Sequence, residues 1–339
     1  MKLSEFDYTL PQELIAQYPL AERDSSRMMV LEHATNKMYE RHFKNIAEYL
    51  NKGDTMVLND VRVLPARLLG RKETGANIEL FLLERLGDGA YKVLAKPSKR
   101  LKAGTKVIFE KGVTATVLEN ADFGKKVRFS GLGDVEEKLR EIGKTPLPPY
   151  IKRDPEKSDE ERYQTVYAKS NGATASPTAG LHFTDKLLEE IKDKGINIAY
   201  VTLNVSYGTF APVVEEEIES HKMHEEYFKL SDEAADIINE TKKNNNKVIA
   251  VGTTATRTLE ACSDGTRVVP KEGYTDLFIY PGYKFKVVDA LLTNFHLPKS
   301  TLLMLVSAFA GREFVLEAYK KSVEEKFRFF SYGDCMFIV

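Results

Sequence analysis

The sequence lacks the features of exported and membrane-spanning proteins. Residues 1–10 contain no basic region leading into an apolar stretch, which a secretory signal would have. The longest apolar run, near residues 302–310, is about half of the roughly 20 residues that a membrane helix needs. We therefore expect a cytoplasmic protein without membrane association.

Cysteine is also scarce. The chain has only Cys262 and Cys335, which are too few for a disulfide framework and form no short metal-binding or redox spacing. A reducing compartment fits this composition.

Charge is balanced overall but divided unevenly along the 339 residues. Of 49 basic and 50 acidic residues, residues 61–155 contain 20 and 12, a net charge of +8, which leaves −9 for the remainder. This asymmetry indicates that one segment contacts a polyanion, and the alternative is chance clustering of solvated charge.

The basic segment has the pattern of a small antiparallel β-barrel. Short runs rich in β-branched residues alternate with turn signals. The expected strands are residues 78–83, 91–95, 106–109, 113–118 and 126–129. Three prolines within residues 146–149 then stiffen the chain, which marks a domain boundary.

The remainder alternates helices with strands, as layered α/β domains do. Thr184, Ser231 and Ser300 are expected to cap three helices. Further elements are expected as a helix within residues 1–60, a helix near 313, strands at 55–58, 196–205 and 247–251, and a last strand at 328–330 or beyond. The fold class is thus a discontinuous, layered α/β domain (residues 1–60 and 156–339) with an inserted small antiparallel β-barrel domain (residues 61–155).

Three segments carry candidate chemistry in the α/β part. Gly252-Thr253-Thr254, between a strand and a helix that contains Arg257, offers free amides to an anion, although a capped turn with a surface arginine explains it too. The small-residue loop 176–184 contains His182, and His296 lies in a second loop at 294–298. Each histidine is a candidate acid or base, or else structural.

Two further clusters remain open to interpretation. His221, His224 and Glu225 have a spacing that would suit a metal on a helix, or else proton transfer, substrate contact or a polar surface. The basic cluster of Lys96, Lys99, Arg100 and Lys102 contains no acid and would follow a phosphate backbone, unless it is simply an exposed hairpin.

Together, these motifs resemble the S-adenosylmethionine:tRNA ribosyltransferase-isomerase family over nearly the whole chain. The matching segments are residues 7–11, 23–24, 59–67, 162–167, 177–183, 208–210, 221–225, 251–254, 280–282, 292–298 and 330–334. The sequence departs from the family pattern at Asn204, Ser206, Ala255 and Cys335, where histidine, glycine, serine and alanine are common. We therefore assign no base at Asn204.

The resemblance implies that S-adenosylmethionine donates its ribosyl group, and that no other cofactor and no metal is needed. The acceptor would be 7-aminomethyl-7-deazaguanine at the wobble position of tRNAs with a GUN anticodon (those for Tyr, His, Asn and Asp). The products would be epoxyqueuosine-tRNA, adenine and methionine. The resemblance leaves the oligomeric state open, and a monomer is the default expectation.

The resemblance and the local patterns together give a set of site hypotheses. The candidate catalytic residues are His182, His296, His221, His224 and Glu225. The candidate substrate-binding residues are Pro177, Thr178, Ala179, Gly180, Phe183, Gly208, Thr209, Phe210, Gly252, Thr253, Thr254, Arg257, Asn294, Phe295, Tyr332 and Asp334. The candidate tRNA-binding residues are Arg62, Arg67, Lys96, Lys99, Arg100 and Lys102.

Two other functions compete with this hypothesis. A non-catalytic RNA-binding protein would bind tRNA in a salt-sensitive way without consuming S-adenosylmethionine. A metal-dependent hydrolase centred on His221 and His224 would contain stoichiometric zinc.

Overall fold

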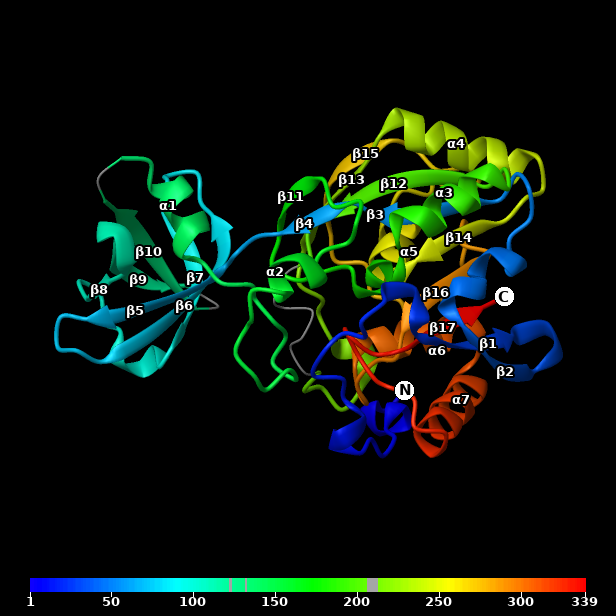
Figure 1. Ribbon diagram of the computed structural model, residues 1–339, viewed down its shortest axis with the longest axis horizontal. Coiled ribbons are helices and arrows are strands. Elements are labelled where there is room, and N and C mark those ends of the chain that lie inside the picture. Colours follow the sequence, from blue (N-terminus) through cyan, green and yellow to red (C-terminus); the bar gives the residue numbers. More distant parts are fainter. Residues whose placement is uncertain (122–123, 132, 206–212) are drawn as a thin grey trace.

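A computed structural model describes residues 1–121, 124–131, 133–205 and 213–339. Figure 1 shows a small β-barrel at one end of the molecule and a larger α/β body at the other. In the described part, no helix is both long enough and apolar enough to cross a membrane.

The larger body contains a nine-stranded mixed sheet in the order β15–β13–β12–β3–β14–β16–β17–β1–β2. Its strands are β1 (Arg27–Glu32), β2 (Lys37–His42), β3 (Thr55–Asn59), β12 (Asn197–Leu203), β13 (Glu226–Leu230), β14 (Val248–Val251), β15 (Lys271–Thr275), β16 (Ala290–Asn294) and β17 (Cys335–Ile338). The central strands β12, β3, β14 and β16 are parallel, so their carboxyl ends meet at one edge.

Helices cover both faces of this sheet. They are α3 (Asp185–Asp193), α4 (Asp232–Lys243), α5 (Gly252–Ala261), α6 (Thr301–Ala310) and α7 (Arg312–Glu324), and the short helix α2 (Asp159–Arg162) precedes them in the chain. Side chains alternate along each strand: Val57 faces a core shared with α4 to α7, whereas Met56 and Leu58 face a core shared with α3. The body is therefore a three-layer α/β structure.

The caps predicted from sequence are confirmed. The hydroxyl groups of Thr184, Ser231 and Ser300 accept hydrogen bonds from backbone N–H groups in the first turns of α3, α4 and α6. Short 3-10 turns complete the chain: η1 (Leu3–Phe6), η2 (Gln12–Leu14), η3 (Arg23–Ser25), η4 (His33–Thr35), η5 (Phe43–Tyr49), η6 (Ser98–Arg100), η7 (Glu110–Gly112), η8 (Thr178–His182) and η10 (Ile218–Ser220).

The barrel closes in the order β10–β7–β6–β5–β8–β9, and every pairing is antiparallel. Its strands are β5 (Arg67–Lys72), β6 (Asn77–Arg85), β7 (Tyr91–Lys96), β8 (Lys106–Ile108), β9 (Thr114–Ala121) and β10 (Gly124–Ser130), followed by helix α1 (Val135–Ile142). The strand β4 (Val61–Val63) lies outside the barrel, where it pairs with β11 (Ser170–Ala173). The fold class is confirmed, and residues 61–155 as the limits of the inserted domain stay a prediction.

Two expectations for the termini hold only in part. The helices of residues 1–60 are all 3-10 helices, the longest being η5, and the strands β1 and β2 were not expected there. Residues 328–330 make a single bridge, from Phe329 to Ile15, and Phe330 has a φ of 68°, which ends any extended strand there. The last strand, expected at residues 328–330 or beyond, is β17.

Candidate active site

A pocket of about 350 Å³ lies where β14 and β16 end. Residues 176–179, 252–254 and 293–300 form most of its wall. The rest of the described wall consists of Tyr150, Val205, Val213, Leu302, Phe330 and Ser331. Open α/β sheets bind ligands at the carboxyl ends of their parallel strands, so this is the expected place for a ligand.

The amino end of α5 faces this pocket. Strand β14 runs directly into α5 at Gly252, whose φ of +88° lies in the region that favours glycine. Val251 at the cap position gives no side-chain hydrogen bond, and the first N–H groups of a helix have no partner within it. The positive end of the helix dipole therefore meets the pocket and favours a negative group there.

Three buried polar atoms belong to pocket residues. They are Ser176 Oγ, Thr254 Oγ1 and Asn294 Oδ1, and none has a hydrogen-bond partner within the described residues. Buried polar atoms in native proteins are nearly always paired. These three consequently mark places where a bound molecule would supply the partner.

Among the described residues, His296 is the histidine that lines this pocket. Its Nε2 lies 2.8 Å from the hydroxyl of Thr293, and its backbone N–H donates to the hydroxyl of Tyr319 over 2.9 Å. Burial lowers the pKa of His296 to about 3, so the imidazole is neutral at pH 7.

His182 lies outside the pocket wall and contacts Asn294, which is part of that wall. Its Nδ1 is 2.9 Å from Ser26 Oγ, and its Nε2 is 3.3 Å from the amide nitrogen of Asn294. The ring is buried against Phe43, and burial lowers its pKa to about 4. Both ring nitrogens are therefore engaged in fixed hydrogen bonds.

Several predicted substrate-binding residues do not line the pocket. Arg257 is buried in an ion pair with Glu226 and donates through Nε to the carbonyl of Leu277 over 3.0 Å, so it is not a surface arginine. Phe183 is buried in the core on the α3 side of the sheet. Gly180 is not in the wall either, and a side chain there would collide with the hydroxyl of Tyr167.

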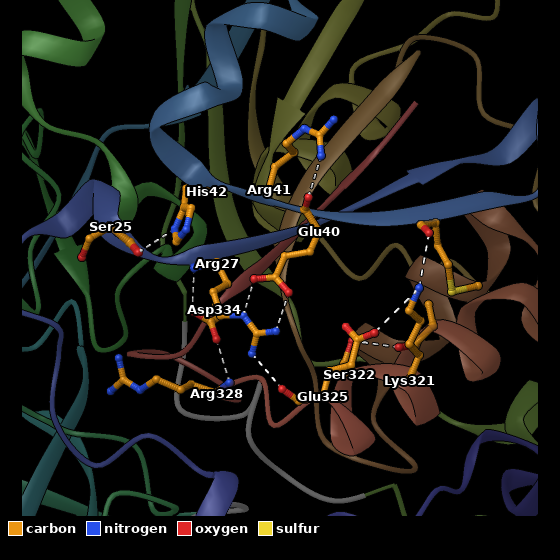
Figure 2. A network of polar contacts seen from close by, with 12 residues as sticks. Ser25, Arg27, Glu40, Arg41, His42, Lys321, Ser322, Glu325, Arg328 and Asp334 are labelled. Carbon is orange, nitrogen blue, oxygen red and sulfur yellow. Dashed lines mark hydrogen bonds and ion pairs between the residues drawn. The ribbon is translucent and has the colours of Figure 1, made fainter.

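The two candidates near the carboxyl terminus hold the backbone in place. Figure 2 shows the carboxylate of Asp334 between Arg27 and Arg328, whose backbone N–H groups donate to it over 2.9 and 2.8 Å. Burial raises the pKa of this carboxyl. The hydroxyl of Tyr332 donates to Asp159 over 2.7 Å. Both side chains thus serve the fold and not the pocket.

A cleft of about 830 Å³ separates the barrel from the α/β body. Arg85, Lys92 and Arg140 line it from the barrel side, and His224 and Glu225 line it from the body. Val205 lines both the cleft and the pocket, so the two are neighbours.

The structure separates the paired histidines. Residues 221–225 contain no helix, so the spacing does not bring both rings to one face. His221 lies 2.8 Å from Glu215 and packs edge-on against Phe278, whereas His224 lines the cleft. No group of three or more metal-ligating side chains occurs within the residues that the structure describes.

The predicted tRNA-binding residues are dispersed. Arg67 forms ion pairs of 3.1 Å with both Glu79 and Asp154, and with Lys96 it lines a separate groove of about 610 Å³. Arg62 donates to the carbonyl of Ala168. The remaining three are exposed on and beside η6: Lys99, Arg100 and Lys102.

Some predicted residues cannot be placed, and others were not predicted. Gly208, Thr209, Phe210 and the departure at Ser206 lie outside the described residues. Ser176, Thr293, Ser300 and Ser331 in the pocket and the three cleft cations were not predicted as site residues. Ser176, Thr293 and Ser331 are next to predicted site residues in the sequence, so proximity was the available signal, whereas the cations stood out only through the charge of their segment.

The comparison with known proteins decides the family. The model of the family described as "Queuosine biosynthesis protein" matches residues 3–338. The chain belongs to this family.

Two curated relatives in the family cover the full chain and are themselves fully covered. The S-adenosylmethionine:tRNA ribosyltransferase-isomerases of Acetivibrio thermocellus and Staphylococcus haemolyticus are 56% and 52% identical to it. A crystal structure of S-adenosylmethionine tRNA ribosyltransferase from Thermotoga maritima is 40% identical. It matches 99% of this chain and 100% of its own, with a TM-score of 0.58.

The three departures from the family pattern within the described residues have different surroundings. Ala255 and Cys335 are buried in the two cores of the α/β body, where neither touches the pocket. Asn204 lines the cleft, and its Oδ1 is buried without a partner within the described residues. Only Asn204 therefore bears on a ligand site.

Proposed function

We propose that this chain is a tRNA-modifying transferase that moves and isomerises the ribosyl group of S-adenosylmethionine. The acceptor is 7-aminomethyl-7-deazaguanine at the tRNA wobble position, and the products are epoxyqueuosine-tRNA, adenine and methionine. The observation that carries the proposal is the pocket at the ends of β14 and β16, lined by the family's sequence motifs and holding three buried polar atoms without partners in the described part. The full-length relatives support the same reaction.

S-adenosylmethionine occupies this pocket. Its methionine carboxylate lies at the amino end of α5, where the N–H groups of the first turn and the helix dipole favour an anion. Thr254 Oγ1 and Ser176 Oγ are further hydrogen-bonding groups nearby. Arg257 stabilises α5 through its ion pair with Glu226 and does not itself bind the anion.

His296 is the proposed catalytic histidine. The sulfonium acidifies the adjacent ribose carbon, and adenine gains negative charge as it departs, so the reaction needs both a proton acceptor and a hydrogen-bond donor. A pKa of about 3 makes His296 a weak base. In the proposed tautomer Thr293 donates to Nε2 of the neutral ring, which leaves the ring hydrogen on Nδ1, where it would stabilise the departing adenine.

The tRNA lies along the cleft. Arg85, Lys92 and Arg140 neutralise phosphates there, and the wobble base is extruded past Val205 toward the pocket, as enzymes that act on bases require. Glu225 and His224 lie on this route and are the remaining candidates for the base that removes the ribose proton. The proposed partner is a tRNA with a GUN anticodon, acted on by a cytoplasmic monomer that needs no metal.

The decisive test is incubation of the purified chain with S-adenosylmethionine and tRNA bearing 7-aminomethyl-7-deazaguanine. Adenine is followed by chromatography and the modified nucleoside by mass spectrometry. Adenine released together with an epoxyqueuosine nucleoside would establish the reaction. Binding of this tRNA without adenine release would contradict the proposed reaction and favour an RNA-binding function.

Replacing His296 tests the catalytic assignment. We expect His296→Ala to lower the turnover number by about 100-fold or more, because it removes a hydrogen-bonding group from the reacting centre. The affinity for tRNA should not change, since the ring is in the pocket and not in the cleft. A His221→Ala variant is the control, and equal losses in the two variants would contradict the assignment.

A further inference from the structure

The amide of Asn294 is held in one orientation. Its nitrogen lies 3.0 Å from the carbonyl oxygen of Phe330 and 3.4 Å from that of Asp334. Carbonyl oxygens only accept hydrogen bonds, so the nitrogen and not the oxygen of the amide must face them. The amide oxygen therefore points away from these two carbonyl groups.

A chain of hydrogen bonds behind Asn294 fixes the same direction. Ser26 donates its hydroxyl hydrogen to the carbonyl of Arg23 over 3.3 Å, so Ser26 Oγ must accept from His182 Nδ1–H. His182 Nε2 is then the acceptor that the amide nitrogen of Asn294 requires. Every donor and acceptor from Arg23 to Asn294 is consistent with this one arrangement, which makes His182 a positioning residue.

The amide oxygen of Asn294 can accept a hydrogen bond from a ligand, because the contacts described above involve only the amide nitrogen. It is buried and has no partner within the described residues, and Asn294 is part of the pocket wall. The side chain is only 2% exposed, so water does not readily satisfy the oxygen. A buried acceptor held this firmly selects a ligand that brings an N–H or O–H donor and rejects one that brings another acceptor.

The charges of the wall decide which donor fits. The described lining residues include no Asp or Glu, and Lys299 is the one charged residue among them. A buried ammonium group without a carboxylate would be costly, so the donor should be neutral. The neutral donors of S-adenosylmethionine are its ribose hydroxyls and the exocyclic amine of adenine, and only the amine distinguishes adenine from other purines.

We propose that Asn294 Oδ1 accepts a hydrogen bond from the exocyclic amine of adenine and thereby selects adenine over other purines. The proposal rests on S-adenosylmethionine being the substrate. His182 acts through Asn294 by holding the amide in the required orientation.

The test compares the binding of S-adenosyl-L-methionine and S-inosyl-L-methionine by calorimetry, together with release of the free purine. The inosyl analogue carries an oxo group in place of the amine. We expect it to bind at least about 30-fold more weakly to the wild type, because two acceptors would then face each other. In Asn294→Ala the two ligands should bind within about 3-fold of each other.

Asn59→Ala is the matched control. Asn59 is also fully buried, but its side-chain nitrogen and oxygen are both hydrogen-bonded to backbone groups of Leu203 and Val61. Its removal should therefore leave the ratio of the two dissociation constants unchanged. His182→Phe should reduce the ratio of the inosyl to the adenosyl dissociation constant. His182→Gln, which can still accept a hydrogen bond from Asn294, should restore part of this ratio.

Three results would overturn the proposal. The wild type could bind the adenosyl and inosyl ligands equally well, or Asn294→Ala could still prefer the adenosyl ligand. The third result is a wild type whose affinity falls only for an analogue that lacks the methionine amino group. If Asn294→Ala does not fold, the wild type is tested with an S-adenosylmethionine analogue that is dimethylated on the exocyclic amine and so lacks the donor. The proposal predicts weaker binding of this analogue, and equal binding would contradict it. Discrimination in binding without any purine release would reject the proposed reaction but not the role of Asn294.

Discussion

At the scale of single residues, the buried pair of Arg257 and Glu226 stabilises the fold. Both side chains are at most 4% exposed, so replacing Arg257 removes the ion-pair partner of a buried carboxylate. We expect Arg257→Met to lower the free energy of unfolding by about 3–5 kcal/mol, measured by urea denaturation.

The exposed pair of Lys229 and Glu272 supplies the control for this prediction. Its side chains are more than half exposed, so Lys229→Met should change the unfolding midpoint little. A stable Arg257→Met protein with a much weaker affinity for S-adenosylmethionine would instead support Arg257 as an anion-binding residue.

The two buried histidines make stability depend on pH. Burial lowers the pKa of His182 to about 4 and that of His296 to about 3, whereas an unfolded chain protonates histidine near pH 6.5. Between these values the unfolded state binds more protons, so the contribution is complete above about pH 6.5 and is lost as the pH falls toward the folded pKa. Each histidine should contribute a slope of about 1.4 kcal/mol per pH unit.

Urea denaturation between pH 5 and 6.5 measures this slope. It should become shallower in His182→Gln and in His296→Gln, while His33→Gln, which removes an exposed histidine, should leave it unchanged. An unchanged slope in both variants of the buried residues would show that neither histidine is kept neutral by the fold.

At the scale of elements, the junction of β14 and α5 depends on Gly252. With φ at +88°, an alanine there would be strained by about 1–2 kcal/mol. Its Cβ would be 3.5 Å from Ala179 and 3.6 Å from Thr254, which are ordinary contacts, so the loss comes from the backbone alone. Thermal unfolding of Gly252→Ala should show it. Gly87→Ala, at a site with open space and no positive φ, should not.

Elements with local signals were predictable from the sequence. A hydroxyl residue before a helical run was enough to place the starts of α3, α4 and α6, because the capping hydrogen bond is made within one turn. Strands β1 and β2 were missed, and Phe330 broke the strand expected at 328–330 because its positive φ depends on the surrounding fold.

The sequence motifs predicted only part of the pocket. The motif positions 177–179, 252–254 and 294–296 do line the pocket. Asp334 and Tyr332 belong to equally specific motifs, yet their side chains hold backbone and neighbouring groups in place. A motif does not distinguish a side chain that faces a ligand from one that supports the loop, because that difference lies in contacts between distant segments.

At the scale of the whole molecule, the uneven charge agrees with the architecture. The net charge of +8 belongs to residues 61–155, which include the barrel, and the −9 belongs to the rest of the chain. An acidic body repels a polyanion and a basic barrel attracts it, so tRNA should be drawn to the barrel side of the cleft. The phosphate contacts should therefore come from cleft cations rather than from the exposed group on and beside η6.

Salt dependence of tRNA binding separates these two sets of cations. Each phosphate contact that is lost should reduce the slope of log K against log salt by about 0.7–0.9. We expect Lys92→Ala and Arg140→Ala, which alter the cleft, to weaken binding and flatten this slope, as measured by filter binding from low to moderate salt. Lys243→Ala, on α4 of the acidic body, is the control because it also removes one positive charge. It should change neither the affinity for tRNA nor the slope. If Lys99→Ala and Lys102→Ala flatten the slope and the cleft variants do not, the tRNA backbone follows the outer loop of the barrel, and the wobble base must reach the pocket by a route other than the cleft.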